Sequence, residues 1–326
     1  VPPLTFISTA YTVLIAGAVA VFADVCRDTI TIDPHDIEQK LSPRTKAIVP
    51  VHWFGHPADM DAIVSLATGH DLAVIEDCAH GPGITLHRRQ TGSFGQISCW
   101  SLQQSKILTA AGEGGLATTD DDVLAARLRQ VCDHGKEKSE KAPSDLAAPY
   151  QVTALGNNYR LGEMHAAFAR AQLNKLDDLQ RRRRSAYVFL HERLCEVPGL
   201  QFQIPRPGAG LSYYCFPVLF PSESFSVPVA QINAAMHVEG IGTHPIALDE
   251  LCHVHPLVAT AAGRATASAY QLTGDAPIPD YGWGTLPVAE KIANELLLLP
   301  MHLDLSERDL DDIIVATRKV AAAYRR

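Results

Sequence analysis

The sequence has no internal repeats, no low-complexity tracts and no Cys-x-x-Cys spacing. Its seven cysteines are scattered and odd in number, which argues against a disulfide framework and against a zinc site. With 326 residues, 47% hydrophobic and 20% charged, it is neither intrinsically disordered nor collagen-like. The chain can therefore bury the core of one large domain or two ordinary ones, and its unpaired cysteines indicate a reducing, cytoplasmic compartment.

An excess of positive charge is also missing. The chain has 28 basic and 36 acidic residues, a formal net charge of -8 and a pI near 5.9. A protein whose main partner is a phosphate backbone or an anionic lipid surface would show the opposite balance. The basic run Arg181 to Arg184 is interpreted as the solvated face of a helix. The expected partner is a small molecule or a protein, and neither nucleic acid nor a membrane.

Charged residues are absent from Val1 to Ala23, a mostly apolar stretch that is long enough for a membrane helix. Pro2 and Pro3 open this stretch, polar residues fall inside it, and no basic segment or small-residue cleavage pattern marks a signal peptide. We interpret it as a buried strand, a helix and a second strand at Ala18 to Val25. Because the chain begins in the middle of this pattern, we expect it to be part of a longer polypeptide.

Short apolar runs alternate with helical patterns in the first half of the chain. The expected strands are Ala18 to Val25, Ala47 to Trp53, Ala73 to Asp77, Ile97 to Leu102 and Gly115 to Thr119. The expected helices include Asp59 to Thr68 and Asp121 to Val131. Apolar strands separated by helices predict an α/β fold with a largely parallel sheet covered on both faces. In such sheets ligands bind beyond the carboxyl ends of the strands.

The second half of the chain begins with a polar, irregular segment, Asp133 to Ala154, which predicts a long loop or lid. One long helix is expected to follow, from Met164 through the basic run. The remainder predicts a strand at Tyr213 to Leu219 and helices at Val229 to Glu239 and Glu307 to Tyr324. We therefore expect a large domain over residues 1–184 and a smaller α/β domain over residues 185–326.

Chemically active side chains follow two of the expected strands. Asp77 ends one strand, with His80 in the next turn, and Ser101 and Lys106 come at the end of another. An amine near a carboxylate fits pyridoxal 5'-phosphate (PLP), which needs a lysine to form a Schiff base and a carboxylate to keep its pyridine nitrogen protonated. The alternative is that Asp77 only caps the turn and that His80 is an ordinary polar loop residue.

Seven segments in order along the chain match the pattern of one enzyme family. They are Pro3 to Phe6, Thr45 to His52, Glu76 to His80, Ser101 to Lys106, Gly112 to Gly115, Gly156 to Arg160 and Leu299 to His302. On these segments the sequence resembles the DegT/DnrJ/EryC1/StrS aminotransferases, which implies a fold-type-I PLP enzyme acting on keto-sugars or keto-cyclitols. The segment Gln103 to Thr109 is most similar to the branch with scyllo-inosose aminotransferases and aminohydroxybenzoate synthases, which implies a ring ketone as substrate.

The resemblance assigns a role to each matching position. It makes Lys106 the Schiff-base lysine, Asp77 the partner of the pyridine nitrogen and His80 the neighbour of the ring hydroxyl. It also makes Ser101 a ligand of the cofactor phosphate and places Phe6 against the cofactor ring. The predicted catalytic residues are therefore Lys106, Asp77 and His80.

The resemblance further implies a homodimer with shared active sites, because Asn158 and Arg160 match a motif that reaches into the partner subunit's site. Relatives have several dozen residues ahead of the position matching Val1, including a loop and helix start whose backbone amides hold the cofactor phosphate. We expect this segment to be missing here, and Ser101 alone is a weak phosphate anchor.

The predicted function is PLP-dependent transfer of an amino group from an amino acid, glutamine or glutamate, to a keto-sugar or keto-cyclitol in secondary-metabolite biosynthesis. One alternative is a non-catalytic aminotransferase-like protein, which the missing segment would favour. Another is a PLP-dependent dehydratase or eliminase, because PLP reactions branch after a common carbanion. No metal is expected, since His244, His253 and His255 have no carboxylate or second cysteine at ligand spacing.

Overall fold

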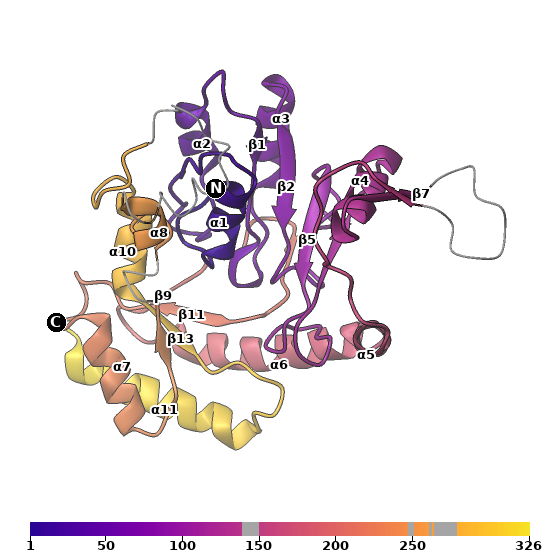
Figure 1. Ribbon diagram of the computed structural model, residues 1–326. Coiled ribbons are helices and arrows are strands. Elements are labelled where there is room, and N and C mark those ends of the chain that lie inside the picture. Colours follow the sequence, from indigo (N-terminus) through magenta and orange to yellow (C-terminus); the bar gives the residue numbers. More distant parts are fainter. Residues whose placement is uncertain (139–149, 247–250, 261–262, 264–278) are drawn as a thin grey trace.

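The computed structural model describes residues 1–138, 150–246, 251–260, 263 and 279–326. Helices and strands of the first half of the chain form the upper part of the view in Figure 1, and α6 (Leu176–Leu194), α7 (Val229–Val238) and α11 (Glu307–Tyr324) form the lower part. Each part has a four-stranded sheet. The predicted α/β class of fold is confirmed.

The sheet of the upper part has the strand order β1-β2-β5-β6. Its strands are β1 (Ala47–Ile48), β2 (Ala73–Asp77), β5 (Ile97–Ser101) and β6 (Gly115–Thr118). β2 is parallel to β1 and β5, whereas β6 is antiparallel to β5. β2, β5 and β6 lie where the alternation of apolar runs predicts them, whereas β1 covers only the first two residues of the predicted strand Ala47 to Trp53. Because β2 and β5 are parallel neighbours, their carboxyl ends meet at one edge of the sheet.

Three helices of the upper part begin at aspartates that cap their first turns. They are α2 (Pro34–Lys40), α3 (Met60–Gly69) and α4 (Asp122–Cys132), capped by Asp33, Asp59 and Asp121. Each aspartate side chain accepts a hydrogen bond from a backbone N–H of the first turn, which would otherwise lack a partner. The buried side chains of α3 pack with β1 and β2 in one apolar core, which includes Ile48, Ile63 and Val74.

The sheet of the lower part is antiparallel, with the strand order β12-β13-β11-β9. Its strands are β9 (Gln201–Phe202), β11 (Phe216–Leu219), β12 (His244–Pro245) and β13 (Leu296–Leu299). The helices α6, α7 and α11 bury apolar residues in the same core as β11, including Leu190, Phe216 and Ile313. The predicted terminal helix is confirmed at Glu307–Tyr324, where Ser306 and Asp309 form a capping box.

The two parts share apolar cores and hydrogen bonds. Leu4 and Phe54 pack in one cluster with Leu219 and Leu296. The buried Asp24 carboxylate accepts hydrogen bonds from the first two backbone amides of Val288 and Ala289 at the start of α10 (Pro287–Glu295). A carboxylate at a helix N-terminus is favourable because it satisfies free N–H groups and opposes the helix dipole.

Chain segments also cross the predicted domain boundary. Helix α6 runs through residue 184, at which the sequence pattern places the end of the large domain. Strand β10 (Ala209–Gly210) pairs with the hairpin of β3 (Thr85–Leu86) and β4 (Arg89–Gln90), so residues after the boundary join a sheet of the first half.

Three expectations for local structure are wrong. Ala18 to Val25 forms no named strand: Phe22 packs with Cys252 and Tyr281, and Val25 forms only an isolated bridge with Ile32. The long helix is broken between α5 (Glu163–Leu173) and α6. The segment from Asp133 to Ala154 is not wholly irregular, because β7 (Lys136–Lys138) pairs with β8 (Tyr150–Val152); residues 139–149 lie outside the described residues.

The basic run is also only partly a solvated helix face. Arg181 is exposed and pairs with Asp178, but Arg183 is buried. Its guanidinium donates hydrogen bonds to the backbone oxygens of Tyr213, Tyr214 and Met301. Burial lowers the pKa of Arg183 below its ordinary value.

The apolar N-terminal stretch contains only one short helix, α1 (Ser8–Ile15). Within the part of the chain that the structure describes, no helix combines the length and the apolar character that a membrane span requires.

Candidate active site

Asp77 lies at the carboxyl end of β2, where backbone hydrogen bonds hold it in the sheet. Its Oδ2 accepts a hydrogen bond from Thr9 Oγ1 at 2.8 Å, and its Oδ1 accepts one from the backbone N–H of Ala79 at 3.0 Å. Thr9 belongs to α1 and shares a further hydrogen bond of 3.1 Å with Thr5. Oδ1 therefore caps the turn, as expected if Asp77 were only a turn cap. Thr9 of α1 fixes the direction of Oδ2.

Lys106 lies in the loop that follows β5. Backbone hydrogen bonds from Leu102 to Gly114 and from Ala110 to Leu102, both 2.8 Å long, close this loop on itself. Leu102, Leu108 and Ala110 pack under the loop in a core shared with α6. The loop therefore presents the lysine from a fixed backbone.

The amine of Lys106 has two hydrogen-bond partners. Its Nζ lies 3.0 Å from His80 Nε2 and 3.5 Å from the hydroxyl oxygen of Tyr214. Burial lowers the pKa of Lys106 below its ordinary value, and the charge of Asp77 opposes this. A lowered pKa increases the fraction of neutral amine, which is the nucleophilic form.

His80 lies between two aromatic rings and is itself buried. The ring of Tyr214 stacks on it with centroids 3.9 Å apart, and the ring of Trp53 stacks on it at 4.9 Å. Burial, followed by the charge of Lys106, lowers the pKa of His80 well below its ordinary value. The imidazole is therefore neutral, and Nε2 accepts a hydrogen bond when Lys106 is protonated. The proton then lies on Nδ1, which is buried and has no hydrogen-bond partner.

The structure thus brings together three of the predicted site residues, Asp77, His80 and Lys106. Two further predicted residues, Ser101 and Phe6, form no side-chain hydrogen bond with this group among the described residues. Ser101 ends β5, and its Oγ accepts a hydrogen bond of 3.4 Å from the backbone of Gln103. Phe6 precedes α1 and is 69% exposed. Their assignments to the cofactor phosphate and ring stay predictions.

Asn158 and Arg160 both contact Asp133, which lies outside the group of Asp77, His80 and Lys106. The backbone of Asn158 forms an isolated bridge with Asp133, and the Arg160 guanidinium donates to the Asp133 carboxylate. Hydrogen bonds from Lys136 and then the charges of Lys136 and Arg160 hold the pKa of Asp133 below its usual range. No hydrogen bond within the described ranges links Asn158 or Arg160 to Asp77, His80 or Lys106.

Three residues of the site are missed by the sequence patterns. Thr9 lies in the apolar N-terminal stretch, and Trp53 and Tyr214 are expected to belong to strands. Each reaches the site from a distant part of the chain: Thr9 is 68 positions from Asp77, and Tyr214 is 108 positions from Lys106. The only local signal is that one residue separates an aromatic pair, Tyr213 and Tyr214, from the buried strand β11.

The residue before Asp77, Glu76, anchors the end of β2 in the protein interior. Its carboxylate accepts hydrogen bonds of 2.7 Å from the backbone amides of Gly92, Phe94 and Gly95, and lies 3.0 Å from His52 Nε2. His52 Nδ1 accepts from the backbone N–H of Ala58, so His52 is neutral and donates through Nε2.

Glu76 also belongs to a group of possible metal ligands. Its carboxylate, His52 and Cys78 have ligand atoms within 4.8 Å of one another. The hydrogen bonds already satisfy the carboxylate of Glu76 and both ring nitrogens of His52. We therefore assign this group a structural role in holding the strand that ends at Asp77. Of the histidines near Cys252, His253 pairs with Glu290 and His255 caps α8 (Pro256–Ala259).

We expect Glu76→Gln to lower the free energy of unfolding by about 3 kcal/mol at neutral pH, because an amide cannot accept all of these hydrogen bonds. Burial alone would raise the pKa of Glu76, but the hydrogen bonds from His52 and the backbone outweigh this and lower it from 4.5. The stability that Glu76 provides is therefore present above pH 4.5 and is lost as the pH falls through the folded pKa.

Urea unfolding at several pH values measures this effect. The difference between the wild type and Glu76→Gln should be largest near neutral pH and should shrink in acid. Glu38→Gln, at an exposed position of α2, is the matched control and should change stability by less than about 0.5 kcal/mol. Equal stability of the two variants would contradict the anchoring role.

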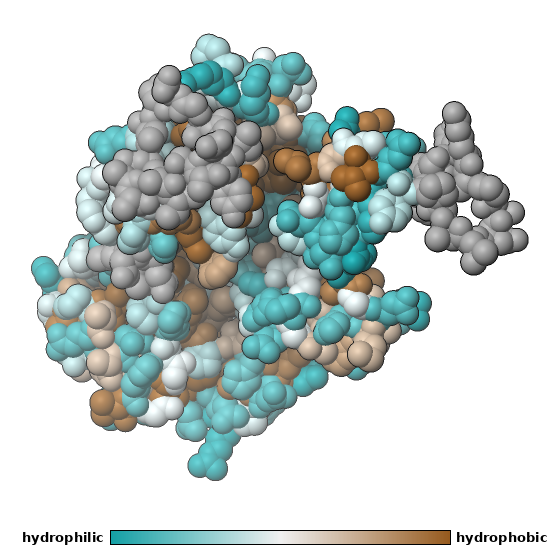
Figure 2. Space-filling view, viewed as in Figure 1, coloured by the Kyte–Doolittle hydropathy of each residue, from teal (hydrophilic) through white to brown (hydrophobic). Residues whose placement is uncertain are grey.

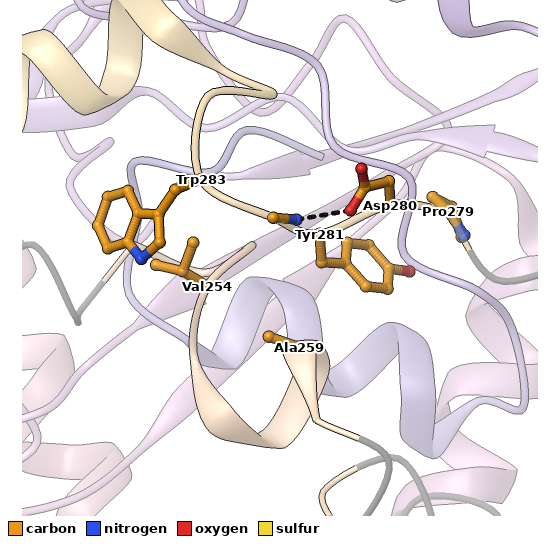
Figure 3. A pocket seen from close by; sticks show the side chains of 7 residues that line it. Val254, Ala259, Pro279, Asp280, Tyr281 and Trp283 are labelled. Atoms are coloured by element: carbon orange, nitrogen blue, oxygen red, sulfur yellow. Dashed lines mark hydrogen bonds between the residues drawn. The ribbon is translucent and has the colours of Figure 1, made fainter.

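A cavity of about 430 Å³ lies away from these residues (Figure 3). It is lined by Val254, Ala259 and the segment Pro279 to Trp283, and Asp280 accepts a hydrogen bond from the backbone of Gly282. Its lining includes none of Asp77, His80 and Lys106. The cavity is therefore separate from the cluster around the lysine.

Comparison with known proteins decides the family. The model of the DegT/DnrJ/EryC1/StrS aminotransferase family matches residues 1–318. The chain belongs to this family. The match begins at residue 1 and gives no support to the expectation that a family segment is missing. The more specific placement in the scyllo-inosose and aminohydroxybenzoate branch is not shown by the relatives.

Two curated relatives match almost the whole chain. The spore coat polysaccharide biosynthesis protein SpsC of Bacillus subtilis is 32% identical over 323 residues, which are 98% of this chain and 77% of SpsC. The UDP-N-acetyl-3-dehydro-alpha-D-glucosamine 3-aminotransferase of Acidithiobacillus ferrooxidans is 35% identical over 327 residues, 98% of this chain and 76% of that enzyme. The chain spans about three quarters of the length of both relatives.

Solved structures agree with this result. An aminotransferase from Psychrobacter cryohalolentis is 30% identical, with a TM-score of 0.82, and the match covers 99% of this chain and 80% of that one. DesV of S. venezuelae is also 30% identical, with a TM-score of 0.81 over 98% of this chain and 77% of DesV.

The protein is a PLP-dependent aminotransferase of this family. Its residues fit the cofactor chemically. The site offers a lysine amine with a lowered pKa, a carboxylate at the neighbouring strand end and the buried, unpartnered Nδ1 of His80. Lys106 would hold the cofactor covalently, and Asp77 and His80 would bind the polar atoms of its ring. When bound, PLP supplies an electron sink for negative charge on the carbon next to the transferred amine.

Proposed function

We propose that this aminotransferase transfers the amino group of glutamate or glutamine to the ketone of a sugar or cyclitol in secondary-metabolite biosynthesis. The observation that supports this most directly is the pair formed by Lys106 and the neutral His80, beside the strand end that presents Asp77. The 35% identical relative is named for a nucleotide-linked 3-keto sugar, which supports a keto-sugar over an open-chain ketone.

Each site residue has a task that its surroundings permit. Lys106 binds the cofactor and, when its amine is free, moves a proton at the substrate carbon. The Asp77 carboxylate, directed by Thr9, stabilises a proton on the ring nitrogen of the cofactor. His80 stays neutral because it is buried and lies beside a cation, so it can hydrogen-bond to a ring oxygen without adding charge. We also assign Ser101 to the phosphate and Phe6 to the ring face.

The reaction can be tested with defined substrates. Purified protein with PLP is incubated with UDP-N-acetyl-3-dehydroglucosamine or scyllo-inosose, and with glutamate or glutamine as the donor. Mass spectrometry should detect one new amine for each donor molecule consumed. A dehydrated sugar in place of the amine would contradict amino transfer and support the elimination alternative. Absence of any product with either ketone would contradict the proposed substrate class.

We further propose that the protein is a homodimer with shared active sites. Helix α5 and strand β6 have no buried residue in the single chain, and α4 has none either. Large apolar side chains are exposed there and on the segment before α5: Leu116, Val123, Leu155, Tyr159, Met164, Phe168 and Leu173. Figure 2 shows apolar residues at the surface over α4 and α5. An exposed apolar face of this extent is typical of a subunit interface.

A second copy of the chain fits this face for two reasons. The interfaces of obligate homodimers are more apolar than the remaining surface, and a two-fold axis pairs one patch with itself. Asn158 and Arg160 lie in the exposed segment directly before α5, and the Lys106 loop packs against Leu161 of the same segment. We propose that in the dimer this segment of one copy lies beside the Lys106 loop of the other.

Mixed dimers test the shared site. Lys106→Ala and Arg160→Ala subunits should each be inactive or nearly so, and mixing them after partial unfolding should restore about a quarter of wild-type turnover. Random exchange makes half of the dimers mixed, and only one of the two sites in each mixed dimer is intact, so a quarter of all sites are intact. Each inactive variant, taken through the same partial unfolding by itself, is the control and should stay inactive. Full activity of Arg160→Ala alone would contradict the shared site.

We propose the domain division that the sequence predicts, with residues 1–184 as the large PLP-binding domain and residues 185–326 as the small domain. We also propose that the enzyme is cytoplasmic. The seven cysteines support a reducing compartment, since all of them are free thiols. The similarity of Gln103 to Thr109 to the aminocyclitol branch supports scyllo-inosose as the second ketone in the test.

A further inference from the structure

We propose that Tyr214 is a positioning residue, which holds the free amine of Lys106 through its hydroxyl and the imidazole of His80 through its ring. Among the described residues, it contacts both members of the lysine–histidine pair from outside the two loops that present them. None of the seven segments that match the family pattern includes Tyr214.

The geometry gives Tyr214 two separate contacts with the pair. Its hydroxyl oxygen lies 3.5 Å from Lys106 Nζ, and the amine also lies 5.0 Å from the centre of its ring. The ring is nearly parallel to the His80 imidazole, at 23° and 3.9 Å. Because Trp53 stacks on His80 as well, the imidazole cannot rotate out of its plane without displacing one of the two aromatic rings.

A hydrogen bond to its backbone carbonyl oxygen holds Tyr214 in place. The buried Arg183 of α6 donates hydrogen bonds to the carbonyl oxygens of Tyr213 and Tyr214 at 3.4 and 3.3 Å, and to that of Met301 at 3.2 Å. Two residues later the chain enters β11, which pairs with β13. The side chain is therefore fixed to the lower part of the molecule, while Lys106 and His80 belong to the upper part.

The chemistry of the phenol suits this task. Burial raises the pKa of Tyr214 above its ordinary value, so the group stays a neutral hydroxyl. A protonated Lys106 has three N–H groups, of which His80 Nε2 and the Tyr214 oxygen accept two. The amine is free whenever substrate has displaced it from the cofactor, and in that state a fixed acceptor keeps it beside the reacting carbon.

Removal of the hydroxyl should change the proton affinity of Lys106. A hydrogen bond to an ammonium is stronger than one to a neutral amine, so the contact with Tyr214 favours the charged form. The titratable groups around the amine are His80, Asp77, Cys215 and Tyr214 itself. Of these, Tyr214→Phe changes only the last and keeps the ring that stacks on His80.

The experiment is competitive acetylation of the full chain, freed of PLP, with acetic anhydride at a series of pH values. Peptide mass spectrometry gives the labelling curve of Lys106. In Tyr214→Phe we expect its midpoint to fall by about half a pH unit to one unit, which makes labelling at neutral pH roughly 3- to 10-fold faster. Tyr213→Phe removes the same atom one residue away and is the matched control, with an unchanged curve.

The second readout uses the PLP-loaded enzyme. Tyr214→Phe should lower kcat by roughly 10-fold and leave KM for the amino donor within about 2-fold, because the hydroxyl holds the lysine and not the substrate. Tyr213→Phe should leave both constants unchanged. A Lys106 labelling curve of Tyr214→Phe that coincides with the wild-type curve would overturn the proposal, whatever happens to kcat, because a merely structural tyrosine would not alter the lysine.

Discussion

Replacement of Lys106 by alanine is expected to abolish amino transfer, with turnover lower by roughly 10⁴-fold or more. The amine is the only nitrogen nucleophile that the described residues place beside both His80 and Tyr214. No neighbour can replace it, because His80 is buried and rigidly stacked and Cys215 is a thiol whose pKa burial raises to about 12. Product formation measured over hours gives the residual rate.

The covalent link to the cofactor can be located in the same protein. Borohydride reduction of the PLP-loaded wild type, followed by peptide mapping, should place the pyridoxyl group on Lys106. Lys319→Ala, at an exposed lysine of α11 that pairs with Glu239, is the control and should keep both the label and the turnover. A pyridoxyl group on another lysine, or an active Lys106→Ala protein, would contradict the assignment.

The second large effect is expected for Asp77→Asn, which should reduce turnover by roughly 10²-fold or more. The side-chain oxygen of asparagine can still accept from Thr9 or from the backbone of Ala79, so the shape of the strand end is kept. What disappears is the negative charge, which favours a proton on the ring nitrogen of the cofactor in the charged reaction state.

The free energy of unfolding shows whether Asp77→Asn lowers turnover by removing the charge or by disturbing the fold. Unfolding in urea should differ by less than about 1 kcal/mol between wild type and Asp77→Asn, because a neutral acceptor remains at the turn. Asp121→Asn keeps a capping side chain at the start of α4 and serves as the control for a lost carboxylate elsewhere. Unchanged turnover of Asp77→Asn would show that the carboxylate is only the cap that its bond to Ala79 forms.

The sequence by itself determined the elements that present the chemistry. Apolar runs predict β2 at its observed bounds, and polar residues directly after β2 and β5 indicate the sheet edge at which Asp77, His80 and Lys106 meet. This succeeds because a buried parallel strand needs a local run of apolar residues, and because parallel neighbours must end at the same edge. The family segments, which are likewise local, indicated the cofactor.

Local patterns gave wrong results where burial came from a distant segment. Ala18 to Val25 looks like a strand because it is apolar, yet its Phe22 packs on Cys252 and Tyr281 and the segment forms no sheet ladder. Arg183 belongs to a run that looks solvated, yet three carbonyl oxygens from Tyr213, Tyr214 and Met301 surround it. Hydrophobicity along the chain shows that a residue is suited to burial, but not what covers it.

Only the tertiary structure decided which side chains complete the site. Thr9 reaches Asp77 across 68 positions, and Tyr214 reaches Lys106 across 108. Neither contact leaves a periodic signal, because each depends on how α1 and β11 pack on the sheet, which the summed burial of all the apolar cores determines. The sequence therefore determined the lysine, the carboxylate and the edge where they meet, whereas packing between distant segments decided how their side chains are oriented and held.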